Sequence, residues 1–258
     1  MKETYKDYFH ASTAARRYAR GRPRFHAFAV ERIARFLEIE KPLGRALDVG
    51  CGTGLSTRAL RAIAERAAGV DLSVEMLAQA ERTENVEYAA ASAERLPFGA
   101  GVFDLITISQ AIHWLDREKF FDEAGRVLKP GAPVVAYDNY FQGRMTGEPR
   151  FEQWYRGEFL VDFPVPPRGR REFARTSERA ADFVLFHEEF NANALEFTAR
   201  SLVDYLVTIT NVIARVENGG ASIDEVYERI LTGIEPFFGG RPKMLEFVGP
   251  IWFLRANH

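Results

Sequence analysis

The sequence predicts an α/β protein built on a doubly wound, mostly parallel sheet with helices on both faces. Short apolar runs alternate with helical apolar patterns between about residues 45 and 138, and a glycine-rich turn follows the first run. Strands separated by helices favour parallel pairing, because each right-handed crossover returns the chain to the same end of the sheet. A chain of 258 residues that is 47% hydrophobic can bury such a core without disulfides.

The order of the elements follows from the apolar spacing. Residues 1–41 are basic and predicted to be helical, with an apolar stripe from Phe25 to Leu37. Apolar runs then predict strands at residues 46–49, 67–70, 86–89, 103–109 and 133–137. The patterns between them predict helices at residues 55–65, 74–80 and 116–128. The last helix has the clearest apolar face, and Asp116 is its expected N-cap.

The alternation stops after residue 138. Residues 139–181 are rich in Gly, Pro and Arg and are predicted to form an irregular insertion. The remaining pattern predicts a strand at 183–190, helices at 198–216 and 223–231, and a final strand at 247–255.

Composition excludes several classes of protein. The formal net charge of −2, from 34 basic and 36 acidic residues, makes nucleic acid an unlikely partner. A single cysteine, Cys51, provides neither a disulfide framework nor a cysteine zinc site. No apolar run of about 20 residues predicts a membrane span, and the first 30 residues lack the pattern of a signal peptide. We therefore expect a soluble, cytoplasmic protein without a membrane partner.

The most specific motif joins the first predicted strand to the following helix and reads Asp48-Val49-Gly50-Cys51-Gly52-Thr53-Gly54. Glycines permit a tight turn and close approach of a ligand, and a helix start favours an anionic group. Asp71 follows Gly54 by seventeen residues, at the end of the second predicted strand, where a carboxylate can accept ribose hydroxyls. Together these features predict an adenosine-containing ligand, although a glycine turn without a ligand is the simpler alternative.

Glycine spacing bears on which ligand is bound. A dinucleotide site has the pattern G-x-G-x-x-G, but Leu55 stands where its third glycine would be. This spacing counts against a nicotinamide-dependent oxidoreductase. Asp48, two residues before the first glycine, can instead face a positive or hydrogen-donating group.

Four blocks in this order resemble the class I S-adenosylmethionine-dependent methyltransferases. They are Leu47 to Gly54, Gly69 to Ser73, Ala91 to Phe98, and Phe103 to Trp114 with Leu128 to Gly131. Within that family, Gln110 to Trp114 is similar to the small-molecule branch that contains trans-aconitate-type methyltransferases. The resemblance implies a Rossmann-like, seven-stranded methyltransferase sheet with a helical cap. It also implies S-adenosyl-L-methionine as cofactor, S-adenosyl-L-homocysteine as product, and no metal.

The resemblance also implies a set of cofactor-binding residues. The methionine half would be lined by Gly50, Cys51, Gly52 and Gly54, with Asp48 near its amino group and with Ser109, Gln110 and Trp114 beyond it. The adenosine half would be bound by Asp71, Leu72, Met76, Ser92, Ala93 and Glu94. Tyr8 and Tyr18 could close over the cofactor from the N-terminal segment, with a packing role as the alternative, and Tyr18 is included among the predicted cofactor residues. One departure is that the adenine-edge block reads Ala-Ser-Ala-Glu, where Gly-Asp-Ala-Glu is common.

We expect one methyltransferase domain over residues 1–258. Its parts would be an N-terminal helical cap (1–41), the cofactor-binding core (42–138), cap insertions (139–181 and 198–222), and a C-terminal helix and strand (223–258). The cap would form the acceptor pocket. The sequence predicts no particular oligomeric state.

His113 is the candidate catalytic residue, because it follows the fourth predicted strand and imidazole titrates near neutral pH. It could act as a base or only shape the loop beside Trp114, whereas His187 is expected to be structural. An arginine cluster at residues 168–179 could anchor an anionic substrate or be solvated surface.

The leading hypothesis is methylation of a small organic molecule, with O-methylation of a carboxylate favoured. The alternatives are a non-catalytic S-adenosylmethionine-binding module, an RNA methyltransferase and the nicotinamide-dependent oxidoreductase.

Overall fold

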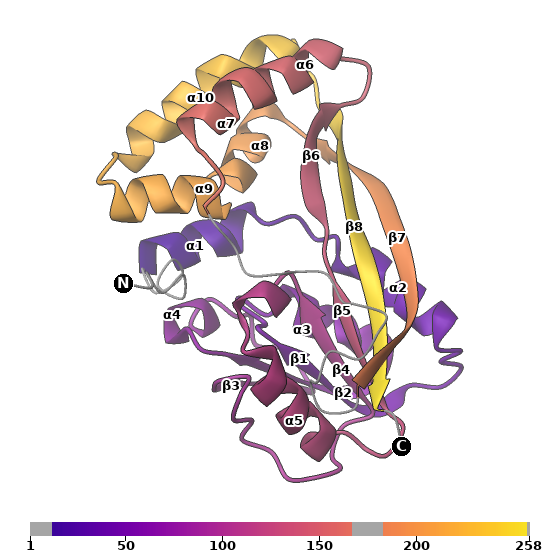
Figure 1. The fold of residues 1–258 in the computed structure, drawn as a ribbon. Coiled ribbons are helices and arrows are strands. Elements are labelled where there is room, and N and C mark those ends of the chain that lie inside the picture. Colours follow the sequence, from indigo (N-terminus) through magenta and orange to yellow (C-terminus); the bar gives the residue numbers. More distant parts are fainter. Residues whose placement is uncertain (1–11, 167–182, 257–258) are drawn as a thin grey trace. The chain divides into compact units, whose positions relative to one another are not determined.

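The computed structural model describes residues 12–166 and 183–256, which form two compact units (Figure 1). Unit 1 contains residues 12–23, 139–166 and 191–249, and unit 2 contains residues 24–138, 183–190 and 250–256. Tyr8 and the arginine cluster at residues 168–179 lie outside the described residues.

Unit 2 contains the predicted parallel sheet. Its five parallel strands are β1 (Leu43–Val49), β2 (Ala64–Asp71), β3 (Val86–Ala90), β4 (Leu105–Ser109) and β5 (Pro133–Tyr137). They pair in the order β3-β2-β1-β4-β5, with Leu47 opposite both Ala68 and Ile106. The chain therefore runs outward from β1 in both directions. The carboxyl ends of β1 and β4 form the switch point at which such sheets bind ligands.

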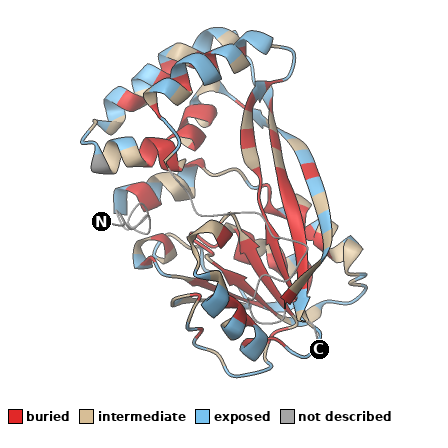
Figure 2. Cartoon of the chain, in the orientation of Figure 1, coloured by how far each residue is buried: buried red, intermediate tan, exposed pale blue. Residues whose placement is uncertain are grey.

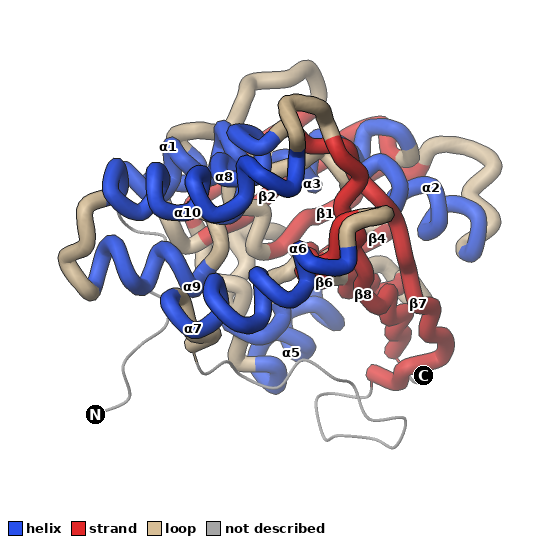
Figure 3. The backbone as a smooth tube through the Cα atoms, turned by 90° about the horizontal axis from the view of Figure 1, so that it is seen from above, coloured by secondary structure: helices blue, strands red, loops and turns tan. Residues whose placement is uncertain are grey.

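Helices cover both faces of this sheet. The helical segments of unit 2 are α2 (His26–Phe36), α3 (Leu55–Ala59), η2 (Leu60–Ala62), α4 (Val74–Leu77), η3 (Ile112–Trp114) and α5 (Arg117–Val127). In Figures 1 and 3, α5 lies on one face, and α2 and α3 lie on the other. The predicted apolar face of α5 is buried, and Asp116 caps the helix by accepting a hydrogen bond from the backbone N–H of Lys119.

The core of unit 2 lies between the sheet and these helices. The last four residues of β1 and all of β5 are buried, as the red strands of Figure 2 show. Burying each large apolar side chain contributes about 1.5–3 kcal/mol, so this core holds the strand ends firmly in register.

Unit 1 consists of helices together with β6 and the parts of two further strands that lie within it. Its elements are α1 (Ser12–Gly21), β6 (Tyr140–Met145), α6 (Pro149–Trp154), η4 (Tyr155–Phe159), α7 (Leu160–Asp162), α8 (Ala199–Leu206), α9 (Thr210–Ile213), η5 (Ala214–Asn218) and α10 (Ile223–Phe238). Phe197 stacks on Phe247 with ring centroids 5.9 Å apart, and Phe247 also contacts Phe141 at 5.4 Å. These rings form the centre of an aromatic core.

Two long strands contribute residues to both units. The first half of β8 (Lys243–Ala256) pairs antiparallel with β6, and its last part pairs antiparallel with β5. β7 (Phe183–Phe197) pairs with β8. The described residues thus contain eight strands rather than the expected seven, while the predicted doubly wound, mostly parallel α/β class is confirmed.

Several element boundaries differ from the prediction. The stretch predicted to be irregular contains β6 and helices α6 and α7, because its Phe and Trp side chains pack into the aromatic core. β7 extends seven residues beyond the predicted end at Phe190. The helix predicted at 198–216 is divided into α8 and α9, and the helix predicted at 55–65 ends at Ala62, before β2 begins.

Candidate functional site

The glycine loop at the end of β1 adopts a backbone that only glycine takes easily. Gly50, Gly52 and Gly54 have φ angles of 71°, 55° and 75°, all in the left-handed region. The backbone N–H groups of Gly50 and Cys51 donate to the carbonyl of Val70 at 2.8 and 3.0 Å, which ties the loop to β2. The motif therefore forms a tight turn at the carboxyl edge of the sheet.

Close neighbours also exclude side chains from this loop. A Cβ on Gly50 would lie 2.5 Å from the Cβ of Ala111, and one on Gly54 would lie 2.2 Å from the hydroxyl of Tyr88. The Tyr88 hydroxyl donates to the carbonyl of Gly54 at 3.3 Å. Alanine at either glycine would clash as well as strain the backbone.

The carboxylate of Asp71 joins the glycine loop to the end of β2. Its Oδ2 accepts the N–H of Gly52 at 2.8 Å, and its Oδ1 accepts the N–H of Ser73 at 2.9 Å. The Ser73 hydroxyl in turn caps α4 by accepting the N–H of Met76 at 3.1 Å. Leu72 is 50% exposed beside this carboxylate, whereas Met76 is buried. The three residues predicted to contact adenosine at this strand end thus include one buried apolar side chain, Met76, and one exposed apolar side chain, Leu72.

Asp48 lies fully buried at the end of β1 and is surrounded by hydroxyl groups. Its Oδ2 accepts from Ser56 Oγ at 2.6 Å and from Thr57 Oγ1 at 2.7 Å, and its Oδ1 accepts from Thr107 Oγ1 at 3.2 Å. Burial raises the pKa of Asp48 to about 6, although the three hydroxyl donors act in the opposite direction. This carboxyl group therefore titrates close to neutral pH.

The end of β4 is the third part of the same edge. Gln110 follows Ser109 with a φ of 54°, which is uncommon outside glycine, and its N–H donates to the carbonyl of Tyr137 at 2.9 Å. His113 and Trp114 follow in a short 3-10 turn, with ring centroids 4.6 Å apart. Both are partly buried.

The predicted adenine-edge block is bonded to the start of α5. The N–H of Glu94 donates to Ser92 Oγ at 3.3 Å, and the Ser92 hydroxyl bonds the carboxylate of Glu94. Glu94 Oε1 accepts the N–H of Asp116 at 2.9 Å, and Ala93 is buried in the core. Glu94 therefore has a structural role in addition to any contact with a ligand.

Comparisons with known proteins identify this region. Residues 47–136 match the family described as a methyltransferase domain. Residues 47–136 of the chain are therefore a methyltransferase domain. A candidate methyltransferase of Dictyostelium discoideum is 34% identical over 92 residues, which are 36% of this chain and 35% of that protein. The malonyl-[acyl-carrier protein] O-methyltransferase of Salmonella typhimurium is 38% identical over 101 residues, 38% of this chain and 40% of that protein.

Solved structures extend the similarity beyond the methyltransferase domain. A candidate type II methyltransferase from Anaeromyxobacter dehalogenans is 27% identical with a TM-score of 0.64, covering 92% of this chain and 96% of that one. A phosphoethanolamine N-methyltransferase of Haemonchus contortus, in complex with S-adenosylhomocysteine, shares the fold at 20% identity and a TM-score of 0.53, covering 98% of this chain and 60% of that one. The curated relatives above are matched over little more than a third of their length.

The structure places nearly all predicted cofactor residues of the methyltransferase domain in unit 2. Tyr18 is the exception, because it lies on α1 in unit 1, where the Arg22 guanidinium carbon is 4.5 Å from its ring centroid. Burial raises the pKa of the Cys51 thiol well above its usual range, which favours the protonated thiol over the reactive thiolate. His187 stacks on Phe36 at 3.8 Å, which agrees with a structural role.

The sequence interpretation missed the polar groups that surround the predicted site of the methyltransferase domain. His26 Nδ1 is hydrogen-bonded to the hydroxyl of Tyr137 at 3.1 Å, and both residues are buried. Thr107 and the pair Ser56 and Thr57 surround Asp48. The signal available in the sequence was position along the strands, because Thr107 lies on β4 beside β1 and Tyr137 is the last residue of the next strand, β5.

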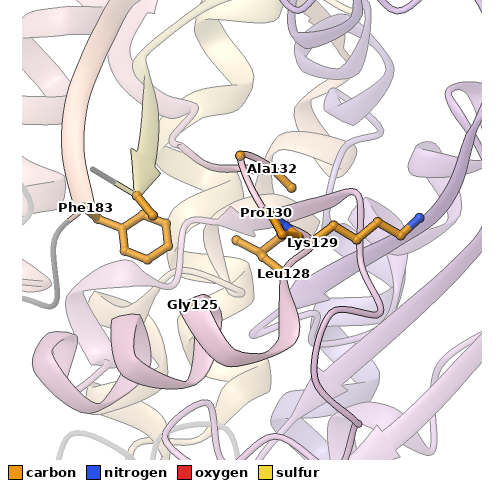
Figure 4. A pocket seen from close by; sticks show the side chains of 8 residues that line it. Gly125, Leu128, Lys129, Pro130, Ala132 and Phe183 are labelled. Atoms are coloured by element: carbon orange, nitrogen blue, oxygen red, sulfur yellow. The ribbon is translucent and has the colours of Figure 1, made fainter. Parts of the chain in front are cut away.

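Other features of the described residues are less informative. A shallow pocket lies at the opposite edge of the sheet, lined by residues that include Leu128, Lys129, Pro130 and Phe183 (Figure 4). Within residues 12–166 and 183–256, no group of three or more His, Cys, Asp or Glu could hold a metal ion. No helix in these ranges is long and apolar enough to cross a bilayer.

Proposed function

We propose that this chain methylates a carboxylate oxygen of a small organic acid, using S-adenosyl-L-methionine and releasing S-adenosyl-L-homocysteine. The observation that carries the proposal is the bond from the Gly52 N–H to the Asp71 carboxylate at 2.8 Å. It joins the glycine turn to an acid at the next strand end, within a domain of the methyltransferase family. The remaining oxygen lone pairs of a carboxylate can accept ribose hydroxyls.

The residues of the loop fit this cofactor. Three left-handed glycines leave the backbone open to close approach, and Asp48 provides a negative charge near neutral pH for an amino group. Leu72, half-exposed beside Asp71, offers an apolar surface for a purine. When bound, S-adenosylmethionine supplies an electrophilic methyl group on a sulfonium. The contribution of the chain is to hold donor and acceptor in line and to exclude water.

A carboxylate acceptor needs no general base, because it is already ionised at neutral pH. Its oxygen forms the new O–CH3 bond while the electron pair of the broken C–S bond stays on sulfur. His113, partly buried beside Trp114, then shapes the acceptor loop rather than removing a proton. Support for a carboxylate comes from relatives named malonyl-[acyl-carrier protein] O-methyltransferases, since a malonyl group has a free carboxylate.

Calorimetric titration of the purified chain with S-adenosylmethionine, S-adenosylhomocysteine and NADH tests the cofactor. Micromolar affinity for the first two and none for NADH is expected, and binding of NADH alone would overturn the proposal. Incubation with methyl-labelled cofactor and a panel of organic acids then tests the acceptor. A carboxyl methyl ester releases its label as methanol in mild base, whereas base-stable label would indicate methylation at another atom.

A further inference from the structure

Tyr88 connects the third strand of the sheet to the glycine loop within unit 2. It lies on β3 directly opposite Gly69 of β2, and Gly69 is in turn paired with Asp48 of β1. Residues in register on parallel strands point to the same face, so Gly69 leaves the space between the side chains of Tyr88 and Asp48 free. The tyrosine ring fills that space. A Cβ on Gly69 would lie 2.9 Å from Cδ1 of Tyr88, and one on Gly54 would lie 2.5 Å from its Cζ.

Two consecutive peptide units of the loop are held from this side. The carbonyl of Gly54 accepts the hydroxyl of Tyr88 at 3.3 Å. The carbonyl of Thr53 accepts Nη1 of Arg58 at 3.4 Å. The C=O and N–H of a trans peptide point in opposite directions, so each contact also directs the N–H group that follows the carbonyl. The Gly54 N–H accordingly donates to the carbonyl of Cys51 at 2.9 Å and closes the turn.

Contacts of this kind matter because a glycine-rich loop is flexible. Glycine loses more conformational freedom on ordering than any other residue, and this loop has a glycine at positions 50, 52 and 54. Groups that order the loop before a ligand arrives therefore lower the cost of binding. The Tyr88 hydroxyl remains a donor for this purpose, because burial raises the pKa of Tyr88 to about 12.

We propose that Tyr88 and Arg58 are positioning residues, which hold the carbonyls of Gly54 and Thr53 and so preform the loop that receives the methionine half of the cofactor. Neither residue needs to touch the cofactor, and both lie outside the motifs that the sequence analysis identified. This inference rests on the proposed function, because it concerns the loop that is proposed to bind S-adenosylmethionine.

Removal of one hydroxyl group tests the proposal with little disturbance. Tyr88→Phe keeps the ring over Gly69 and loses only the hydrogen bond to Gly54. Calorimetry should show S-adenosylhomocysteine binding about three- to tenfold more weakly, as expected for one lost hydrogen bond. 5′-Methylthioadenosine has the adenosine half without the amino acid part, so its affinity should change by less than about twofold. A merely structural role would not produce this difference between the two ligands.

A second variant and a matched control complete the set. Arg58→Met keeps an apolar stem of similar length and loses the contact with the Thr53 carbonyl, so it should show the same selective loss. Tyr227→Phe is the control, because the Tyr227 hydroxyl also donates to a backbone carbonyl, that of Arg200 in unit 1, at 3.4 Å. This control should leave both affinities unchanged.

The pattern of affinities decides the outcome. A loss confined to S-adenosylhomocysteine in Tyr88→Phe and Arg58→Met supports the proposal, and a selective loss in one variant alone would refute the role of the other residue. Equal losses for both ligands, a similar loss in Tyr227→Phe, or variants that no longer unfold cooperatively in urea would indicate a general structural effect and would refute the proposal.

The two proposals fail in different ways. If S-adenosylhomocysteine does not bind the wild-type chain, the proposed function itself is wrong. If it binds the wild type, Tyr88→Phe and Arg58→Met with equal affinity, only the positioning role is wrong.

Discussion

Asp48 is expected to make the protein less stable as the pH rises through the weakly acidic range. Burial raises its pKa from 3.8 to about 6 at a position that is 0% exposed. A carboxyl group whose pKa is higher in the folded than in the unfolded chain holds its proton more tightly when folded. Its stabilising contribution is therefore complete below about pH 4 and is lost as the pH rises to about 6. A shift of about two pKa units corresponds to about 3 kcal/mol.

The variant Asp48→Asn isolates this effect because it carries no charge at any pH. Its amide oxygen can still accept from the hydroxyls of Ser56 and Thr57. The free energy of unfolding of the variant minus that of the wild type should grow by about 2 kcal/mol between about pH 4.5 and about pH 7. Other groups titrate alike in both proteins, so the difference reports Asp48. Urea unfolding at several pH values measures it.

Asp104→Asn is the matched control in the same unit. The Asp104 carboxylate accepts the N–H of Arg45 at 2.9 Å and pairs with Lys129 at 2.6 Å, so losing its charge should destabilise the protein at neutral pH. A difference between Asp48→Asn and wild type that is flat with pH, or that shrinks as the pH rises, would refute the argument about a buried charge.

Three further predictions concern the same edge of the sheet. Asp71→Asn removes the charged acceptor of the Gly52 and Ser73 amides and of the proposed ribose hydroxyls. Calorimetry should show S-adenosylhomocysteine binding at least tenfold more weakly. Unchanged affinity in a folded variant would contradict the proposed contact between Asp71 and the ribose. Gly54→Ala should lower the free energy of unfolding by about 3 kcal/mol. The control Gly131→Ala should lower it by about 1 kcal/mol, because Gly131 has a similar φ but no atom within 4 Å of an added Cβ. Equal losses would show that the clash with Tyr88 is unimportant. If an ionised Asp48 faces the amino group of the cofactor, affinity should fall up to about tenfold per pH unit below about pH 6, and titrations that give one affinity at all pH values would exclude this contact.

The sequence predicted the parallel half of the fold because each strand there is a short apolar run. Residues 46–49, 67–70 and 133–137 are buried strands whose neighbours on both sides are apolar, so hydrophobicity alone identifies them. The observed boundaries of helices and strands differ from the predicted ones where local signals compete. The helix after Gly54 ends early because β2 begins at Ala64, although residues 55–65 have a continuous helical pattern.

The later part of the chain could not be predicted in the same way. The second half of β7 contains Asn191 and Asn193, which are depleted in strands, and pairing with β8 maintains the strand against local preference. β6 includes Gly143 at a φ of 72°, where an added Cβ would meet the ring of Tyr155 at 2.0 Å. Its glycine and arginine resemble a loop, and only the aromatic core of unit 1 makes the segment a strand.

The candidate site was predictable only as far as motifs extend along the chain. Glycine spacing and Asp71 lie in one short stretch of sequence, whereas the bond from Thr107 to Asp48 joins residues 59 apart. The contact between His26 and Tyr137 joins residues 111 apart. Such partners depend on strand order, which a single sequence gives only through the whole topology.

The two edges of the parallel sheet differ in how their polar groups are satisfied. At the amino edge, Asp104 is paired with Lys129, a contact that favours folding. At the carboxyl edge, the buried carboxyl of Asp48 and the left-handed backbone of Gln110 reduce stability, whereas three glycines accommodate the left-handed turn. Two other non-glycine residues have positive φ: Glu38 follows α2, and Asn85 directly precedes β3. Among the described residues, a non-glycine positive φ at the carboxyl end of a strand therefore occurs only at Gln110. Folding alone does not require a buried carboxyl and a strained residue at this edge, and we infer that a ligand bound at the strand ends would compensate part of their cost.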